Sequence, residues 1–476
     1  MMMGTNYFTR YRHIAPLAVF RIVFGAVLFY STCRFITKGW VNDFYIVPKY
    51  HFPFKGFEWL RPMDSGSMYT VYGIMALAAL FICIGLFYRL STVVFFLCFC
   101  YSELLDKTYY LNHYYLVTIL SFLLIFAPAN RYFSVDVLRK PSLKATQVPS
   151  WSILMFKYQL CIIYCCAGLS KLTSEWLLHA MPLKIWLPAK SSLPLIGSFL
   201  QYEWTAYFFS WASALFDLSI CFLLLNKSSR RLGYFLVIIF HVMTALLFQI
   251  GMFPWLMISA TLIFFSENFH IRIINNAERL TRNAERLTRN AERLTRNAER
   301  LTRNAERLTL NAERLTRKAV FQKLQLILLG IFFLFQLIIP FRFLLYPGTL
   351  LWTEEGYRFS WRVMLMEKGG TSFFYVRDGL SGKKREVNNS NFLTPYQERM
   401  METQPDMILQ YAQILRRHYE AEGMKNPEIT VESYVTLNGS GSRLFIDSSI
   451  NLAEEKETWF GHKQWILPYQ KNQNRR

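Results

Sequence analysis

The chain has 476 residues, of which 53% are hydrophobic and 17% aromatic, while only 18% are charged. Soluble proteins of ordinary composition carry about 25% charged residues, so this composition, with long apolar runs before residue 266 and a polar segment after residue 342, excludes a single soluble globular body. The net charge of +21 does not require nucleic acid as a partner, and we expect none, because membrane proteins gather Lys and Arg in their cytoplasmic loops.

Apolar runs that could cross a bilayer fill most of residues 14–265. A helix needs about 20 apolar residues to cross about 30 Å of hydrocarbon. The candidate spans are 14–36, 69–88, 91–105, 112–127, 153–170, 202–225, 231–250, 251–265 and, further along, 321–341. Two of them, 91–105 and 251–265, are short and could be tilted, re-entrant or halves of longer elements. The sequence therefore predicts a polytopic α-helical membrane protein with about eight or nine spans, in which residues 1–270 form a transmembrane bundle.

Residues 276–317 repeat a seven-residue unit, NAERLTR, six times, with Leu310 as the only deviation. Ala277 and Leu280 give a weak heptad seam, and Glu278 with Arg282 forms a favourable i,i+4 pair. We therefore predict a helical insert over residues 271–320, on the cytoplasmic side because Arg outnumbers Glu. A solvated spacer and a surface for a partner or for lipid headgroups are both open interpretations of this insert.

After the last expected span, 321–341, residues 342–476 read as a water-facing domain. SFFYVRD (372–378) and ITVESYVTL (429–437) alternate apolar and polar residues as strands do, and one helical stretch is expected near 395–420. We expect a mixed, mainly β domain outside the cytoplasm. All eight cysteines precede residue 342, which excludes a disulfide framework in this domain, and no spacing of Cys or His indicates a metal site.

Ionisable side chains inside apolar spans are costly, so each is a functional candidate. Lys171 ends the fifth span, where it could simply reach the interface or be a desolvated amine that acts as a base. His113, which begins the fourth span, could be a structural hydrogen bonder, and Asn112 beside it could cap the helix. His241 lies in mid-span, where it could tie two helices together. Three more charged residues are expected to pair among themselves as structural links: Arg21, Asp217 and Glu203.

Several blocks of the chain resemble one known family. In order they read LAVFRIVFGAVLFY, LLDKTYYLNHYYL, IIYCCAGLSKLTSEW, IIFHVMTALLFQIGMF, FYVRDGLSGKKREV and DMILQYAQILRRHYEAEGMKNPEITVESYVTLN. Both the membrane part and the polar part are similar to the vitamin K-dependent γ-glutamyl carboxylases. The likeness runs from about residue 14 to about residue 470 and is interrupted by the NAERLTR array.

The resemblance implies an enzyme that uses vitamin K hydroquinone, O₂ and CO₂, and no metal, to convert glutamate in a protein or peptide into γ-carboxyglutamate while forming the quinone epoxide. The γ-hydrogen of glutamate is too weakly acidic for any side-chain base, whose pKa values end near that of lysine. The family therefore amplifies a modest base: the hydroquinone is deprotonated, oxygen adds, and collapse to the epoxide gives an alkoxide strong enough to remove the γ-hydrogen. The resulting carbanion attacks CO₂. The modest base has to be an uncharged amine at neutral pH.

The family's base lysine, carried on its AG-x-x-KL-x-x-x-W segment, corresponds here to Lys171. Relatives usually have a second lysine directly before it, where this chain has Ser170. The resemblance also places Asn112 and His113 at the hydroquinone, where they could hydrogen-bond a developing oxyanion. His241 matches a family histidine whose role stays open, and the surrounding apolar runs suit an isoprenoid tail that enters from membrane lipid.

Two departures from the family pattern concern the water-facing part. The animal enzymes join a cysteine of the membrane part to one in the later domain, and no cysteine follows residue 342 here; a family histidine is also absent where this chain has Glu367. These differences favour a multi-pass protein of the bacterial cytoplasmic membrane over one of the endoplasmic reticulum. They also leave two alternatives to a carboxylase: a quinol epoxidase that does not carboxylate protein, and a non-catalytic membrane scaffold or transporter.

Overall fold

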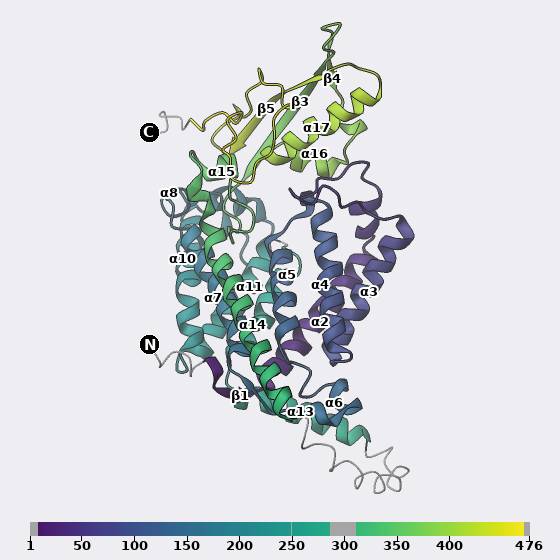
Figure 1. Ribbon diagram of the computed structural model, residues 1–476. Coiled ribbons are helices and arrows are strands. Elements are labelled where there is room, and N and C mark those ends of the chain that lie inside the picture. The colour runs from purple at the N-terminus through teal and green to yellow at the C-terminus, as the bar shows by residue number, and fades with distance from the viewer. Residues whose placement is uncertain (1–7, 249, 286–310, 471–476) are drawn as a thin grey trace.

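The computed structural model describes residues 8–248, 250–285 and 311–470, without the side chains of residues 280–323, and consists of a helical bundle with a smaller domain stacked on one end (Figure 1). The helices of the bundle are α2 (Ala15–Thr37), α3 (Ser65–Ile84), α4 (Tyr88–Leu105), α5 (Asn112–Phe126), α7 (Trp151–Ser170), α10 (Glu203–Leu225), α11 (Arg230–Phe248), α12 (Phe253–Thr261), α13 (Glu267–Glu285) and α14 (Asn311–Ile338). Each apolar run of the sequence therefore forms a helix.

In the described part of the chain, seven helices are long and apolar enough to cross a membrane. These are α2, α3, α4, α7, α10, α11 and the stretch Leu324–Leu345, which begins in α14. These candidates agree with the predicted polytopic helical membrane protein, and the count of about eight or nine spans stays a prediction. Two helices, α5 and α12 with the short turn Leu262–Phe264, are apolar but shorter, and the 15 residues of α5 rise only about 22 Å, less than the hydrocarbon thickness.

The second span lies about four residues earlier than the run 69–88 predicted. Helix α3 ends at Ile84 because Gly85 takes a left-handed conformation with φ of 70°, and α4 begins at Tyr88. Glycine is needed here for space as well, since a Cβ at Gly85 would lie 2.0 Å from Nη1 of Arg21. The turn between α3 and α4 is thus built around the Arg21 guanidinium.

The prediction that Arg21, Asp217 and Glu203 pair among themselves is wrong. Arg21 is fully buried and donates to the backbone carbonyls of Ile82 and Phe133. The other two acids pair with lysines, Asp217 with Lys171 and Glu203 with Lys184. None of the three pairs with another of the three: Arg21 binds backbone carbonyls, and each acid binds a lysine.

The end of the bundle away from the smaller domain is formed by short elements and by α13 (Figure 1). Strand β1 (Tyr11–His13) pairs with β2 (Gln147–Pro149), and α6 (Val135–Arg139) lies nearby. The first NAERLTR unit continues α13, and the last unit continues without a break into α14 and the final span. The central units, residues 286–310, lie outside the described residues, so the helical spacer stays a prediction there.

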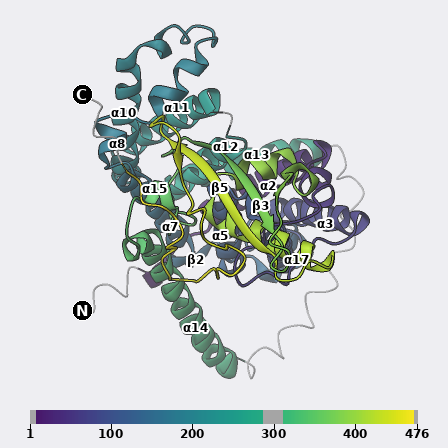
Figure 2. The same ribbon diagram turned by 90° about the horizontal axis from the view of Figure 1, so that it is seen from above.

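The smaller domain contains a four-stranded antiparallel sheet of order β4 (Lys384–Val387), β3 (Lys368–Arg377), β5 (Glu428–Leu437) and β6 (Arg443–Leu444). Both alternating segments of the sequence form its long central strands, which cross above the bundle in Figure 2. Phe374 and Val431 face each other in register and are buried under α17 (Pro405–Ala421).

The single helical stretch expected near 395–420 is two helices, α16 (Pro395–Met401) and α17. Pro405 lacks a backbone N–H and starts a helix well, but cannot continue one. With α16 and α17 against a small sheet, the domain is mixed rather than mainly β.

Buried charges join the smaller domain to the bundle. The carboxylate of Asp406, at the start of α17, accepts a hydrogen bond from Lys107, which follows α4, at 3.2 Å, and another from Arg358. Burial acts to raise the pKa of Asp406, but Arg358, Lys107 and Lys463 outweigh it and hold that pKa well below its ordinary value. The charged form of Asp406 is therefore part of the folded state.

We expect Asp406→Asn to lower the stability of the docked domain by about 3–5 kcal/mol, because it leaves buried cations without their carboxylate. The thermal unfolding midpoint in detergent should fall clearly, and wild type should lose the same stability as pH falls below the ordinary carboxyl range, because the depressed pKa makes the folded state favour the ionised form. Glu428→Gln, which breaks a surface pair with Arg377, is the matched control and should change the midpoint little. Equal midpoints for Asp406→Asn and this control would contradict the assignment.

Candidate active site

Lys171 is the residue at which α7 ends, and its side chain turns into the protein. The residue is 6% exposed, and its amine forms an ion pair with Asp217 of α10, which is equally buried. The rings of Trp176 and Phe240 lie 5.6 and 6.0 Å from the nitrogen. A lysine that reaches the interface would be exposed, so the burial of Lys171 contradicts that interpretation. Its role as a base stays a prediction.

A glycine brings the two helices close enough for this pair. Gly168, almost one turn before Lys171, packs on α10 so closely that a Cβ would lie 2.9 Å from the backbone nitrogen of Leu218. Asp217 is the preceding residue on α10. The glycine of the AG-x-x-K segment therefore has a physical role, because it sets the distance at which the carboxylate meets the amine.

Lys171 and Asp217 lie on the wall of a cavity of about 390 Å³ between α7, α10, α11 and α12, here named the Lys171 cavity. Among its described lining residues these two carry the only charges, and most others are aromatic or aliphatic. Ligand pockets have volumes of about 300–1,000 Å³ and apolar walls with few polar groups. The cavity has the character of a site for an apolar ligand with a polar head.

His241 lines the same cavity and also links two helices. Its Nε2 lies 3.1 Å from the hydroxyl of Tyr164 on α7, so His241 ties α11 to α7 as one sequence interpretation predicted. Its Nδ1 is buried and has no hydrogen-bond partner in the described part of the chain. The residue thus has a structural contact and one unused nitrogen.

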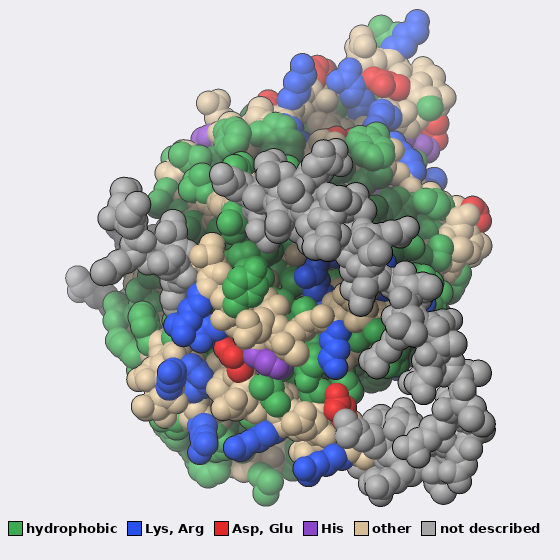
Figure 3. All heavy atoms as spheres, turned by 60° about the horizontal axis from the view of Figure 1, so that its bottom comes forward, with side chains coloured by type: hydrophobic (Ala, Val, Ile, Leu, Met, Phe, Trp, Pro, Cys, Tyr) green, Lys and Arg blue, Asp and Glu red, His purple; other side chains and the backbone are tan. Residues whose placement is uncertain are grey.

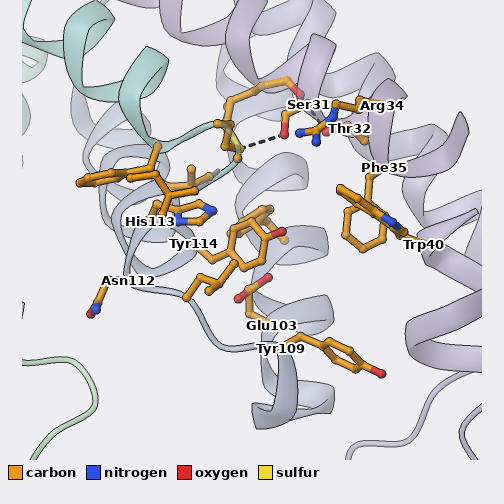
Figure 4. Close-up of a pocket in the computed structure, with 18 of the residues that line it drawn as sticks. Ser31, Thr32, Arg34, Phe35, Trp40, Glu103, Tyr109, Asn112, His113 and Tyr114 are labelled. Carbon is orange, nitrogen blue, oxygen red and sulfur yellow. Dashed lines mark hydrogen bonds between the residues drawn. The ribbon is translucent and has the colours of Figure 1, made fainter. Parts of the chain in front are cut away.

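His113 opens α5 and faces a second cavity, of about 580 Å³, here named the His113 cavity (Figure 4). The imidazole is buried and makes no hydrogen bond with the described part of the chain. Glu103, Arg34 and Tyr114 line the same cavity. This space is therefore more polar than the Lys171 cavity and has both signs of charge on its walls.

Asn112 does not cap α5, because the structure places it inside the first turn with no capping hydrogen bond. Its amide oxygen accepts from the Tyr110 hydroxyl at 3.1 Å, and its amide nitrogen donates to the carbonyl of Arg362 at 3.0 Å. Asn112 thus holds the segment that enters the smaller domain against the bundle, at the edge of the His113 cavity (Figure 4).

The four candidate residues are divided between two adjacent cavities. Lys171 and His241 line one, whereas Asn112 and His113 line the other. The residues that line both cavities form a shared wall: Ile250, Phe253, Val363 and Met364. The Phe253 ring lies between the two imidazoles, 6.0 Å from His113 and 5.6 Å from His241 between ring centroids. The Phe253 ring is therefore one part of the wall that separates the two cavities.

Comparison with known families matches nearly the whole chain. Residues 9–269, more than half of it, match the HTTM domain, and residues 321–472 match the lumenal domain of vitamin K-dependent gamma-carboxylase. The chain belongs to the vitamin K-dependent γ-carboxylase family. No solved structure matches the chain.

The structure shows the surroundings of the two departures of this family member from the carboxylase pattern, which concern its cysteines and Glu367. All eight cysteines are free thiols, and none is paired between the bundle and the lumenal-type domain. Glu367, near the place of the absent family histidine, accepts a hydrogen bond from the indole of Trp186, and its backbone pairs with Asn438. Since Trp186 lines the Lys171 cavity, Glu367 connects the smaller domain to that wall. Among the described residues no cluster of His, Cys, Asp or Glu could hold a metal ion.

The ion pair between Lys171 and Asp217 was not predicted from the sequence. Asp217 was expected to pair elsewhere, and it lies 46 residues from its partner Lys171, a separation with no local periodicity to reveal it. Glu103 and Arg34 were not identified at all. Glu103 lies inside an apolar span, and the cost of a carboxylate there was the signal that could have found it.

Proposed function

We propose that the protein is a γ-glutamyl carboxylase that uses vitamin K hydroquinone, O₂ and CO₂ to convert protein glutamate into γ-carboxyglutamate, with the quinone epoxide as second product. One observation carries this proposal. Lys171, the residue that corresponds to the family's base, is buried on the wall of an apolar cavity of about 390 Å³ whose only other charge, among the described lining residues, is Asp217.

The Lys171 cavity fits a quinol by its residues. Its aromatic and aliphatic walls suit a naphthoquinol ring, and several exposed apolar residues of α10 and α11, such as Phe208 and Ile239, also line it. An isoprenoid tail would therefore find an apolar path from lipid. When bound there, the hydroquinone supplies the electrons that reduce O₂ and a weakly acidic hydroxyl for Lys171 to deprotonate.

The role of Asp217 follows from its ion pair with Lys171. A carboxylate stabilises the ammonium form, so Lys171 can act as a base only after its own proton has left. Asp217 is the nearest acceptor, and transfer of the proton to its carboxylate gives two neutral groups without changing the net charge of the cavity. Lys171 then takes the quinol proton on Nζ. Asp217 is thus a positioning residue and an internal proton acceptor.

We assign the glutamyl side chain to the His113 cavity. In this arrangement Asn112 and His113 lie beside the glutamyl group, across the shared wall from the hydroquinone that the resemblance implies for them. The two cavities adjoin at Phe253, which suits a reaction in which a strong base formed on one side has to reach a γ-hydrogen on the other. Arg34 supplies a cation for the glutamyl carboxylate. Val363 and Met364, on the shared wall, lie shortly before β3 in the chain, so we expect the smaller domain to bring a bound peptide to this cavity.

A paired assay on the purified, reconstituted protein tests the proposal. With reduced vitamin K, labelled bicarbonate and a glutamate-containing peptide, we expect epoxide and labelled peptide to form together. Epoxide without label would replace the carboxylase by the quinol epoxidase alternative. Neither product would indicate a non-catalytic scaffold.

A further inference from the structure

The end of the bundle opposite the smaller domain contains a third cavity, of about 990 Å³, here named the basal cavity. It is lined by the first two turns of α7 and α13, the start of α11 and the end of α10. Its cationic lining residues are Arg12, Lys157, Lys227, Arg230, Arg231 and Arg272. Figure 3, which turns this face forward, shows Lys and Arg side chains gathered over it with apolar surface around them.

These cations have almost no anionic partners. Glu267 is the only acidic lining residue among those described, and it already binds Arg12 at 3.6 Å and the backbone N–H of His13 at 3.1 Å. Within the described part of the chain the other five cations form no ion pair; Arg230 donates only to the carbonyls of Leu224 and Leu225. Like charges in one cavity repel each other, so an anion placed among them is favoured.

The position of Lys157 deep in the cavity and the apolar residues around its rim indicate which kind of anion would bind. Lys157 lies six residues after the start of α7, about 9 Å along the helix axis, and its nitrogen is 5.8 Å from the ring of Phe264. Leu154, Leu225 and Phe265 also line the cavity. Beyond it the outer faces of α10 and α11 expose large apolar residues such as Phe222 and Leu232. A ligand with a phosphate at this level and hydrocarbon chains along these helices would match both features.

We propose that the basal cavity binds the phosphate headgroup of an anionic phospholipid, with the acyl chains lying along α10 and α11. Basic pockets between spanning helices are a recognised place for such headgroups. The site is separate from the catalytic cavities, since it shares no lining residue with either of them.

Native mass spectrometry and thermal unfolding of the full chain in neutral detergent test the proposal, with phosphatidylglycerol and phosphatidylcholine as probes. We expect phosphatidylglycerol to bind and to raise the unfolding midpoint, and phosphatidylcholine to do neither. Lys157→Gln/Arg231→Gln should weaken phosphatidylglycerol binding about thirtyfold. Lys140→Gln/Lys144→Gln, which removes the same charge from exposed positions outside the cavity, should leave it unchanged.

Three results would overturn the proposal: equal binding of both lipids, equal loss in both double variants, or stabilisation by inorganic phosphate that displaces the lipid, which would indicate a soluble phosphate ligand. If Lys157→Gln/Arg231→Gln does not fold, Lys227→Gln/Arg231→Gln replaces it, because it keeps Lys157, the most deeply placed of these cations. The same loss of phosphatidylglycerol binding is expected, and its absence would again contradict the site.

Discussion

We expect Lys171→Met to lower both epoxide and γ-carboxyglutamate formation by at least about a hundredfold, because it removes the only amine among the described lining residues of the Lys171 cavity. General acid–base groups contribute about 10²–10⁴-fold to a rate. Both products should fall together, since deprotonation of the quinol precedes each of them. The measurement is chromatographic separation of the epoxide and of labelled peptide from one reaction.

Because Lys171 is buried and paired, the Lys171→Met variant needs a control for lost stability. A lysine at the interface could be removed at little cost, but Lys171 is buried and paired, so the single substitution Lys171→Met would leave the Asp217 carboxylate without a cation, at a cost of about 3–5 kcal/mol. Lys171→Met/Asp217→Leu removes both charges and should recover the thermal midpoint without recovering either product. Recovery of activity together with stability would show that Lys171 serves folding and not the reaction.

Lys184→Met is the matched control for the loss of a paired lysine. Lys184 also pairs with a carboxylate of α10, that of Glu203, but it does not line the Lys171 cavity. Both activities should stay within about twofold of wild type, because exposed pairs contribute little. A loss as large as that of Lys171→Met would indicate that any break in this region stops the enzyme.

Helices and strands that depend on a pattern of neighbouring residues could be predicted from the sequence. Each apolar run became a helix, and the alternating segments 372–378 and 429–437 became neighbouring strands. The errors at the ends of elements have local causes too: Gly85 ends α3 early to make room for Arg21, and Pro405 divides the last helical stretch. Propensity patterns average over several residues and do not resolve such single positions.

The site was predictable only as separate residues. The resemblance indicated Lys171, Asn112, His113 and His241, but not their division between two cavities, which depends on where Phe253 lies. Asp217 was assigned to the wrong partner because an ion pair across 46 residues is a property of helix packing. The glycine of the AG-x-x-K segment was the one local sign of that close packing, since only a residue without a side chain lets α10 approach α7 at this point.

Asp217→Asn should change how the rate depends on pH as well as the rate itself. In the proposed path the amine passes its proton to the adjacent carboxylate. No proton is then exchanged with solvent at this step, and epoxidation should vary little across the neutral range. Asparagine keeps the size of the side chain but cannot accept that proton, so Lys171 has to lose it to solvent. We expect a rate about 10–100-fold lower at neutral pH that increases with pH, because the proton now leaves to solvent.

Asp217→Glu separates this role from simple packing. It restores a carboxylate on α10 near the Lys171 amine, so the flat pH profile should return even if the rate stays reduced, because the longer side chain has to fit the space that Gly168 leaves. If Asp217 only held the helices together, both variants would lower the rate by a constant factor and their profiles would run parallel to wild type. Parallel profiles would therefore remove Asp217 from the proton path and leave Lys171 to be activated by burial alone.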